Sequence, residues 1–305
     1  MKSGFRNLLV RRDTARFKAY FLAIALQMLT LPLLQLLGIV KFTVPAFYPL
    51  GAALGGFLFG LAMNWGGGCA GGVWYKLGGG SIGAFVAIIG LILGYVTTES
   101  GALKSLRTLI QSIGSDGGVE TMTITSWFNL PLWWISVPLA VVLLFFLLKK
   151  SPTNPEKGWN WRKTGLCVGA IGIIAWVASS LSGRFFGMAV MPGNKDALEL
   201  MTIGKFSALS WDFFFVLGIP IGGFLSTMRD GAFSWSNISG ASIWKLAGGG
   251  FVLGVSASLA GGCTVGHGLT GIPLLSLGSI TFTIFAILGA WAGVLMQKKI
   301  EKRKA

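Results

Sequence analysis

Long apolar stretches, separated by short polar segments, run through most of the 305-residue chain. Because a helix needs about 20 apolar residues to cross the hydrocarbon core of a bilayer, this pattern predicts an all-α polytopic membrane protein. Some stretches fall short of that length, notably 81–97 and 211–227. The expected spans are 19–40, 47–65, 81–97, 128–148, 164–182, 211–227, 242–262 and 279–297.

Composition agrees with this class. Hydrophobic residues make up 53% of the chain and charged residues only 11%, against about a quarter charged in soluble domains. The formal net charge of +15 does not indicate nucleic acid, because the basic residues gather at the ends of apolar spans. No nucleotide-binding P-loop is visible and no cysteine has zinc-ligand spacing, so no cofactor or metal is expected.

The basic segments predict the orientation of the chain. They are 6–18, before the first span, 149–163, in the middle, and 298–304, at the end. Lys and Arg accumulate on the cytoplasmic side of membrane proteins, so all three segments should be cytoplasmic. The more acidic segment 98–127 is the best extracytoplasmic candidate. We therefore expect a multi-pass protein of the cytoplasmic (inner) membrane.

The two halves of the chain resemble each other. A shift of 194 residues places Gly55, Gly56, Gly60, Gly67, Gly68 and Cys69 on Gly249, Gly250, Gly254, Gly261, Gly262 and Cys263. After the cysteines the alignment slips by four, so that 80–82 meets 278–280. This predicts two pseudo-symmetric transmembrane repeats, 1–150 and 164–305, joined by a cytoplasmic linker, 151–163.

Each repeat carries a cysteine inside a glycine cluster, at 66–72 and 261–268. Irregular backbone at membrane depth is tolerated where it lines a polar path, and short interrupted segments in matching places of two halves indicate a binding site. A thiol is soft and polarizable, which suits a sulfur-bearing solute. Short helices starting at 70 and 264 should point free N–H groups at the thiols. The alternatives are buried packing cysteines or a reactive thiol.

Other residues could join the path. The predicted path residues are Cys69, Cys263, Gly67, Gly68, Gly261, Gly262, His267 and Arg184. His267 could relay protons or donate to an anion; a neutral, hydrogen-bonded histidine is the alternative, and the first repeat has Val73 at the aligned position. Arg184 follows a span in a Gly-aromatic setting. Cys167 has no partner in the first half and is expected to pack.

These motifs resemble the YeeE/YedE family of sulfur-compound transporters. The resemblance rests on the two Gly-Gly-Cys motifs and on the elements at 5–7 and 228–230, and it implies an hourglass-like fold whose re-entrant Gly-Cys loops dip toward a narrow centre. Cys69 and Cys263 would match the two central cysteines. The Gly-x-Phe-Cys-like element that usually precedes the first repeat has no counterpart here. Either the start is truncated relative to the family, a separate subunit supplies the helix, or the mechanism tolerates its loss.

The resemblance implies a transporter, not an enzyme, that imports a small sulfur-containing anion, with thiosulfate as the leading candidate. A selenium-compound transporter, or a membrane thiol enzyme that relays sulfur as a cysteine persulfide, is the alternative. The expected partners are the anion, the lipid bilayer and a sulfur-carrier or sulfurtransferase protein on the cytoplasmic side, without nucleic acid. Since no Asp or Glu lies at the centre of a predicted span, we expect a channel-like route with weak dependence on a proton gradient.

Overall fold

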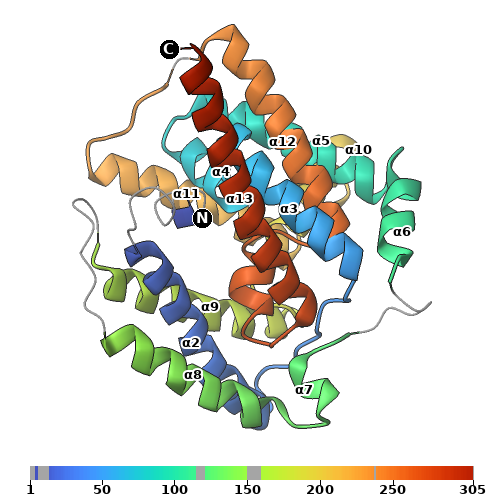
Figure 1. The fold of residues 1–305 in the computed structure, drawn as a ribbon, viewed down its shortest axis with the longest axis vertical. Coiled ribbons are helices and arrows are strands. Elements are labelled where there is room, and N and C mark those ends of the chain that lie inside the picture. Colours follow the sequence, from blue (N-terminus) through green and yellow to red (C-terminus); the bar gives the residue numbers. More distant parts are fainter. Residues whose placement is uncertain (1–3, 6–13, 115–120, 150–158, 237, 305) are drawn as a thin grey trace.

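The computed structural model describes residues 4–5, 14–114, 121–149, 159–236 and 238–304 (Figure 1). This part of the chain is helical and contains no strand. The helices are α2 (Ala15–Leu36), α3 (Pro49–Trp65), α4 (Ala70–Gly78), α5 (Ile82–Glu99), α6 (Lys104–Ser112), α7 (Ile124–Trp127), α8 (Leu132–Lys149), α9 (Trp161–Leu181), α10 (Met191–Ile203), η1 (Phe206–Ala208), α11 (Trp211–Arg229), α12 (Gly240–Ala260), η2 (Gly266–Gly271) and α13 (Leu277–Lys304).

The prediction of an all-α membrane protein is confirmed. Each of the expected spans coincides with a helix, displaced by a few residues at its ends. In the described residues, seven helices are long and apolar enough to cross a membrane: α2, α5, α8, α9, α11, α12 and α13. Helix α3 has only 17 residues and leads directly into the first Gly-Cys motif.

Local sequence explains several of the helix starts. The Ser81 hydroxyl accepts a hydrogen bond from the Ala84 N–H at the start of α5, and Ser210 accepts one from the Phe213 N–H at the start of α11. Such caps satisfy N–H groups that lack a partner in the first turn. Pro32 and Pro220 lie inside α2 and α11, as is tolerated in membrane helices.

The centre of the molecule is formed by α3, α5, α12 and α13. Helix α12 packs against α3 and α5, and α13 packs against α3. The backbones approach closely because small residues lie at the crossings: a Cβ on Gly60 of α3 would collide with the Ala286 carbonyl of α13. Close approach through small residues replaces the hydrophobic driving force that helices lack in lipid.

A second group of helices consists of α2, α8 and α9, which lie together at the lower left of Figure 1. Helix α2 packs against both of its neighbours, and Gly165 and Gly169 of α9 let that helix approach Ala19 and Ala23 of α2. Helix α11 packs against α4 and α10 instead. The first Gly-Cys motif lies between α3 and α4, and the second lies between α12 and η2.

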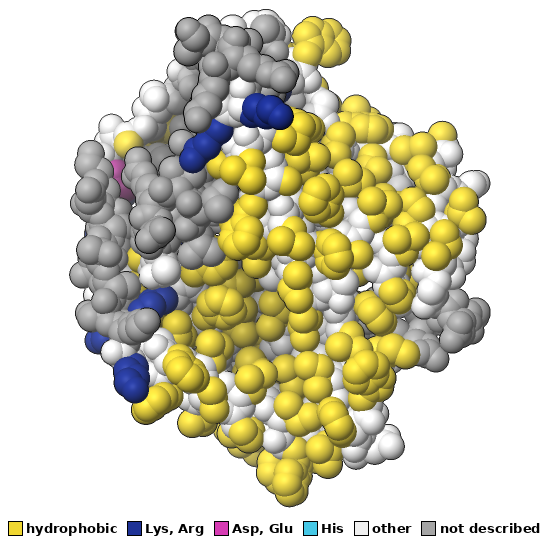
Figure 2. Space-filling model, in the orientation of Figure 1, with side chains coloured by type: hydrophobic (Ala, Val, Ile, Leu, Met, Phe, Trp, Pro, Cys, Tyr) yellow, Lys and Arg dark blue, Asp and Glu magenta, His cyan; other side chains and the backbone are white. Residues whose placement is uncertain are grey.

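The exposed surface of the molecule is largely apolar, as expected for a protein surrounded by lipid. Figure 2 shows apolar side chains spread over most of one face, with Lys and Arg at its margin. Phe145 and Phe146 of α8 and Ile174 of α9 are more than 60% exposed. A continuous apolar surface of this kind would be a liability in water and is expected where acyl chains cover it. The expected linker 151–163 falls largely on 150–158, which lies outside the described residues, as does 6–13 of the first basic segment.

Candidate functional site

The first Gly-Cys motif ends α3 and starts α4. Gly67 adopts a φ of +80°, a conformation that glycine reaches without a steric penalty, and the chain turns there so that Cys69 becomes the N-cap residue of α4. The Cys69 sulfur lies over the N–H of Gly72. The expected short helix after the first thiol is therefore confirmed, with a free N–H group facing sulfur.

The second motif repeats this geometry with a different helix. Gly261 has a φ of +78°, and the Cys263 sulfur faces the N–H groups of Val265 and Gly266. The Cys263 carbonyl accepts a hydrogen bond from the His267 N–H at 2.9 Å, just as the Cys69 carbonyl accepts one at 3.0 Å four residues on. The segment that follows is the π-helical turn η2 rather than a regular α-helix; such turns are frequent at functional sites.

Two cavities border the two thiols. The Cys263 cavity has a volume of about 260 Å³, and the Cys69 cavity about 320 Å³. The residues that line the Cys263 cavity include Cys263, Gly261, Gly262, Arg184, Tyr95 and His267. Those that line the Cys69 cavity include Cys69, Arg16, Tyr20, Thr164, Thr264 and Val265. Both cysteines are free and buried.

The partition between the cavities is thin and apolar. Cys263 lines one cavity and the next residue, Thr264, lines the other. A Cβ on Gly71 would lie 3.4 Å from Val265 Cγ2 and 3.9 Å from Val190 Cγ2. The Thr264 hydroxyl lies beside the Cys69 thiol and has no nitrogen or oxygen partner among the described residues. The two thiols therefore lie on opposite sides of one short barrier.

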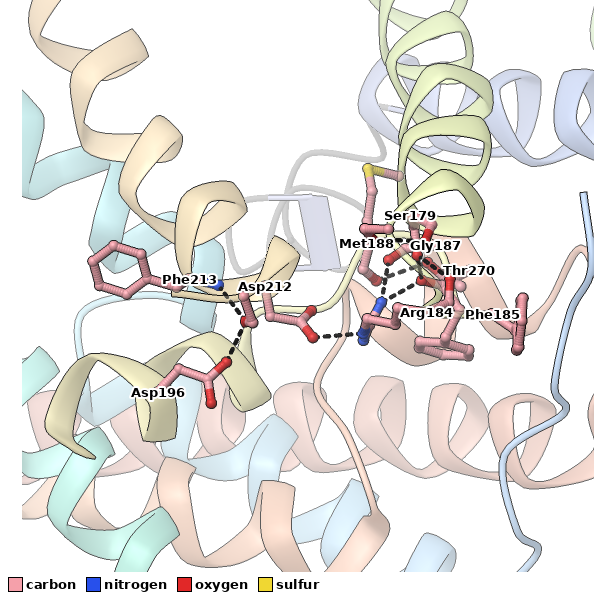
Figure 3. Close-up of polar contacts among 12 residues, drawn as sticks. Ser179, Arg184, Phe185, Gly187, Met188, Asp196, Asp212, Phe213 and Thr270 are labelled. Atoms are coloured by element: carbon pink, nitrogen blue, oxygen red, sulfur yellow. Dashed lines mark hydrogen bonds and ion pairs between the residues drawn. The ribbon is translucent and has the colours of Figure 1, made fainter. Parts of the chain in front are cut away.

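Arg184 is held firmly at the Cys263 cavity. Its Nη1 donates to the Phe186 carbonyl and, at 2.8 Å, to the Gly187 carbonyl. Its Nε forms an ion pair with Asp212 Oδ2 at 2.5 Å (Figure 3). Contacts at both Nε and Nη1 therefore fix the guanidinium at the cavity.

His267 lies in the wall of the Cys263 cavity, and both of its ring nitrogens have partners. Nε2 is 3.1 Å from the Ala260 carbonyl and Nδ1 is 3.0 Å from the Ser279 hydroxyl. A carbonyl only accepts, so Nε2 carries the proton and Nδ1 accepts from Ser279. The ring also stacks on Phe282 at 4.4 Å. This geometry favours a neutral histidine that ties η2 to α12 and α13.

Replacing His267 tests whether its role is to link η2 to α12 and α13. We expect His267→Gln to keep most of the uptake measured in vesicles, because a glutamine amide still donates to the Ala260 carbonyl. His267→Ala should lower the free energy of unfolding by about 1–3 kcal/mol, since it leaves a buried carbonyl unsatisfied. Thermal unfolding and the pH profile of uptake measure the two effects. A folded His267→Gln protein whose uptake has lost its pH dependence would show that His267 relays protons instead.

The other predicted residues are placed as follows. Gly261 and Gly262 line the Cys263 cavity, while Gly67 and Gly68 shape the first turn and line neither cavity. The Gly67 carbonyl accepts a hydrogen bond from Lys76 Nζ at 2.5 Å. Cys167 lies in α9, half-buried, and lines neither cavity.

Several residues of the site carry no signal in the sequence that would have predicted them. Tyr95 lines the Cys263 cavity and Tyr20 the Cys69 cavity, and each hydroxyl lies near enough to a thiol to interact with it electrostatically. Arg16, predicted only as an orientation signal, also borders the Cys69 cavity. Asp212 contacts Arg184 but carries little signal in the sequence. It lies seven residues after Lys205, at the start of an apolar stretch.

A bundle of membrane-length helices around two cavities, each with a buried thiol and a neighbouring arginine, defines a multi-pass membrane protein with internal cavities. Comparison with known proteins gives the family. Residues 1–292 match the family described as Sulphur transport, and the chain belongs to it.

Two relatives are similar over nearly their full length. The Thiosulfate transporter TsuA of Escherichia coli (strain K12) is 28% identical over 323 residues, which cover all of this chain and 91% of the relative. The Thiosulfate transporter TsuA of Spirochaeta thermophila is 30% identical over 299 residues, which cover 95% of this chain and 90% of the relative. Both names describe transporters, which agrees with the prediction of a transporter rather than an enzyme.

Proposed function

We propose that this protein imports thiosulfate across the cytoplasmic membrane through a path that passes Cys263 and then Cys69. The observation that carries the proposal is the placement of the two thiols on opposite sides of one apolar partition, each facing its own cavity. The family and the names of both relatives support a sulfur anion as the solute.

The direction of the path follows from the basic segments. The Cys69 cavity is bordered by Arg16 at the start of α2 and by Thr164 at the start of α9. Basic residues precede both helices, so this cavity opens to the cytoplasm under the positive-inside rule. The Cys263 cavity is bordered by residues 43–45 and by Arg184, which follow the opposite ends of these helices. Thiosulfate would enter there.

Weak contacts suit such a path, because a solute must be able to leave as well as enter. The terminal sulfur of thiosulfate would meet the thiols, which are poor hydrogen-bond donors. The oxygen atoms would meet Arg184 and the N–H groups that face each cysteine. Val190 and Val265 at the partition keep water from forming a continuous column. A sulfurtransferase or sulfur carrier could receive the anion below the Cys69 cavity.

Helix contacts support a pseudo-twofold, hourglass-like arrangement of the two repeats. The close approach of Gly60 to Ala286 recurs as that of Gly254 to Leu91. The approach of Gly289 to Phe57 likewise recurs as that of Gly94 to Phe251. Under this pseudo-twofold relation, α3 corresponds to α12 and α5 corresponds to α13.

The same relation pairs the short helices that follow the two cysteines, α4 and η2. Helix α4 packs against α11 and α5, while η2 packs against α2 and α13. The glycine contacts relate α3 to α12 at an offset of 194 and α5 to α13 at 195, as the pair Gly94 and Gly289 illustrates. For α5 and α13 they favour the offset of 195 over the offset of 198 that the alignment of 80–82 with 278–280 predicts. We therefore assign the core repeats to α3–α5 and α12–α13.

Uptake into proteoliposomes tests the proposed function. Vesicles containing the purified protein should take up radiolabelled thiosulfate in a saturable manner, and protein-free vesicles should not. Because the described spans carry no acidic residue at their centres, an imposed pH gradient should change the initial rate by less than about twofold. The absence of thiosulfate uptake would refute the function. Accumulation that a protonophore abolishes would refute the facilitated route alone.

A further inference from the structure

Asp212 is the acidic residue that contacts Arg184. It is the second residue of α11, and its side chain is almost fully buried, 6% exposed. Its Oδ2 pairs with Arg184 Nε, while its Oδ1 has no partner among the described residues. Figure 3 shows Asp212 pointing toward Arg184 from α11. Arg184 lines the Cys263 cavity and Asp212 does not, so the carboxylate lies behind the guanidinium.

A neighbouring carboxylate provides a contrast. Asp196 of α10 accepts a hydrogen bond from the Ser210 hydroxyl at 2.5 Å, and Ser210 in turn caps α11. Asp196 is near enough to Arg184 to interact with it electrostatically but forms no ion pair with it within the described part of the chain. Of the two carboxylates, Asp212 therefore has the larger influence on the charge that the cavity experiences.

The balance of charge decides what the cavity can distinguish. Thiosulfate and sulfate are both dianions and differ by one sulfur atom in place of oxygen. An uncompensated guanidinium binds either through its oxygen atoms. A carboxylate that cancels most of the positive charge weakens these oxygen contacts, which sulfate can make with four oxygen atoms and thiosulfate with only three. The contact between the thiol and the terminal sulfur then decides between the anions. A buried charge without a partner would instead dominate the binding.

We propose that Asp212 is a specificity-determining residue: by neutralising Arg184 from behind, it prevents sulfate from competing with thiosulfate at the Cys263 cavity. This inference rests on the proposed thiosulfate path and adds a role for a residue outside the cavity wall. It also explains why a path for an anion retains a buried carboxylate beside its arginine.

The test is inhibition of radiolabelled thiosulfate uptake by sulfate, in proteoliposomes of the full-length protein. Asp212→Asn keeps the shape and removes the charge. We expect the ratio of its inhibition constant for sulfate to its KM for thiosulfate to fall by about tenfold, because the close counter-charge of Arg184 is lost. Asp196→Asn is the matched control, with the same charge change on the neighbouring element, and should shift this ratio by less than about threefold. Equal shifts in the two variants would overturn the proposal.

A second comparison covers the case in which Asp212→Asn does not fold. Arg184→Gln leaves the carboxylate unpaired near the path, so the KM for thiosulfate should rise. Adding Asp212→Asn to Arg184→Gln should lower that KM again and leave sulfate inhibition as weak as in the wild type. Strong sulfate inhibition in the double variant, or an unchanged KM, would overturn the proposal. If the wild-type protein takes up no thiosulfate, the proposed function fails first, whatever the variants do.

Discussion

Replacing either Cys69 or Cys263 by alanine is expected to reduce thiosulfate uptake to the level of protein-free vesicles. Each thiol is the soft group that its cavity offers to the terminal sulfur of the anion, and the two lie in series on opposite sides of the partition. Loss of either one would therefore interrupt the whole path. Both side chains are small, so truncation should cost about 1 kcal/mol of stability and leave the fold intact.

Cys167→Ala is the matched control, because this cysteine lies in the membrane-length helix α9 and lines neither cavity. Growth on thiosulfate as sole sulfur source and vesicle uptake should be normal in this variant. Normal growth of the Cys69→Ala and Cys263→Ala strains would contradict the path. Full activity of the corresponding serine variants would indicate that the cysteines only pack.

Mass spectrometry after exposure to substrate separates the transporter from a thiol enzyme. A transporter that makes only non-covalent contacts stays unmodified while it continues to take up thiosulfate. A stable mass gain of one sulfur on Cys69 or Cys263 would instead identify a persulfide, as a sulfur relay requires. We expect the unmodified outcome, because the proposed contacts between the anion and the two thiols are non-covalent.

Much of the fold could be predicted because lipid imposes a simple rule on sequence. A span must be apolar and about 20 residues long, and the helices begin within four residues of the expected positions. The Gly-Cys motifs could be found because irregular backbone at membrane depth needs glycine. Gly67 and Gly261 indeed have the same positive φ.

Contacts between distant segments were less predictable. The ion pair between Arg184 and Asp212 joins the loop before α10 to the start of α11, and no spacing rule connects the two. Tyr20 and Tyr95 have ordinary positions in apolar helices and became part of the site only through packing. Local sequence matches could not fix the register of the repeats after the cysteines, because α4 and η2 differ in length and helix type.

The glycines at the helix crossings give the second large effect. We expect Gly60→Ala and Gly254→Ala each to lower the free energy of unfolding by about 1–3 kcal/mol or more, the usual cost of an overpacked core. A Cβ on Gly60 would collide with the Ala286 carbonyl, and one on Gly254 with the Leu91 carbonyl. Since neither obstacle is the end of a flexible side chain, whole helices must move apart.

Gly248→Ala is the control for helix propensity. Gly248 lies in α12 like Gly254, but a Cβ there meets nothing within 4 Å. Alanine should therefore be neutral or stabilise by up to about 1 kcal/mol, as it does in the interior of a helix. Thermal unfolding of the detergent-solubilised protein, followed by tryptophan fluorescence, compares the variants. If Gly60→Ala and Gly254→Ala lower the unfolding temperature by similar amounts and Gly248→Ala does not, the crossings in the two repeats are equivalent. A loss in only one of them would contradict the pseudo-twofold arrangement, because the α3–α13 and α5–α12 crossings would then differ in their packing.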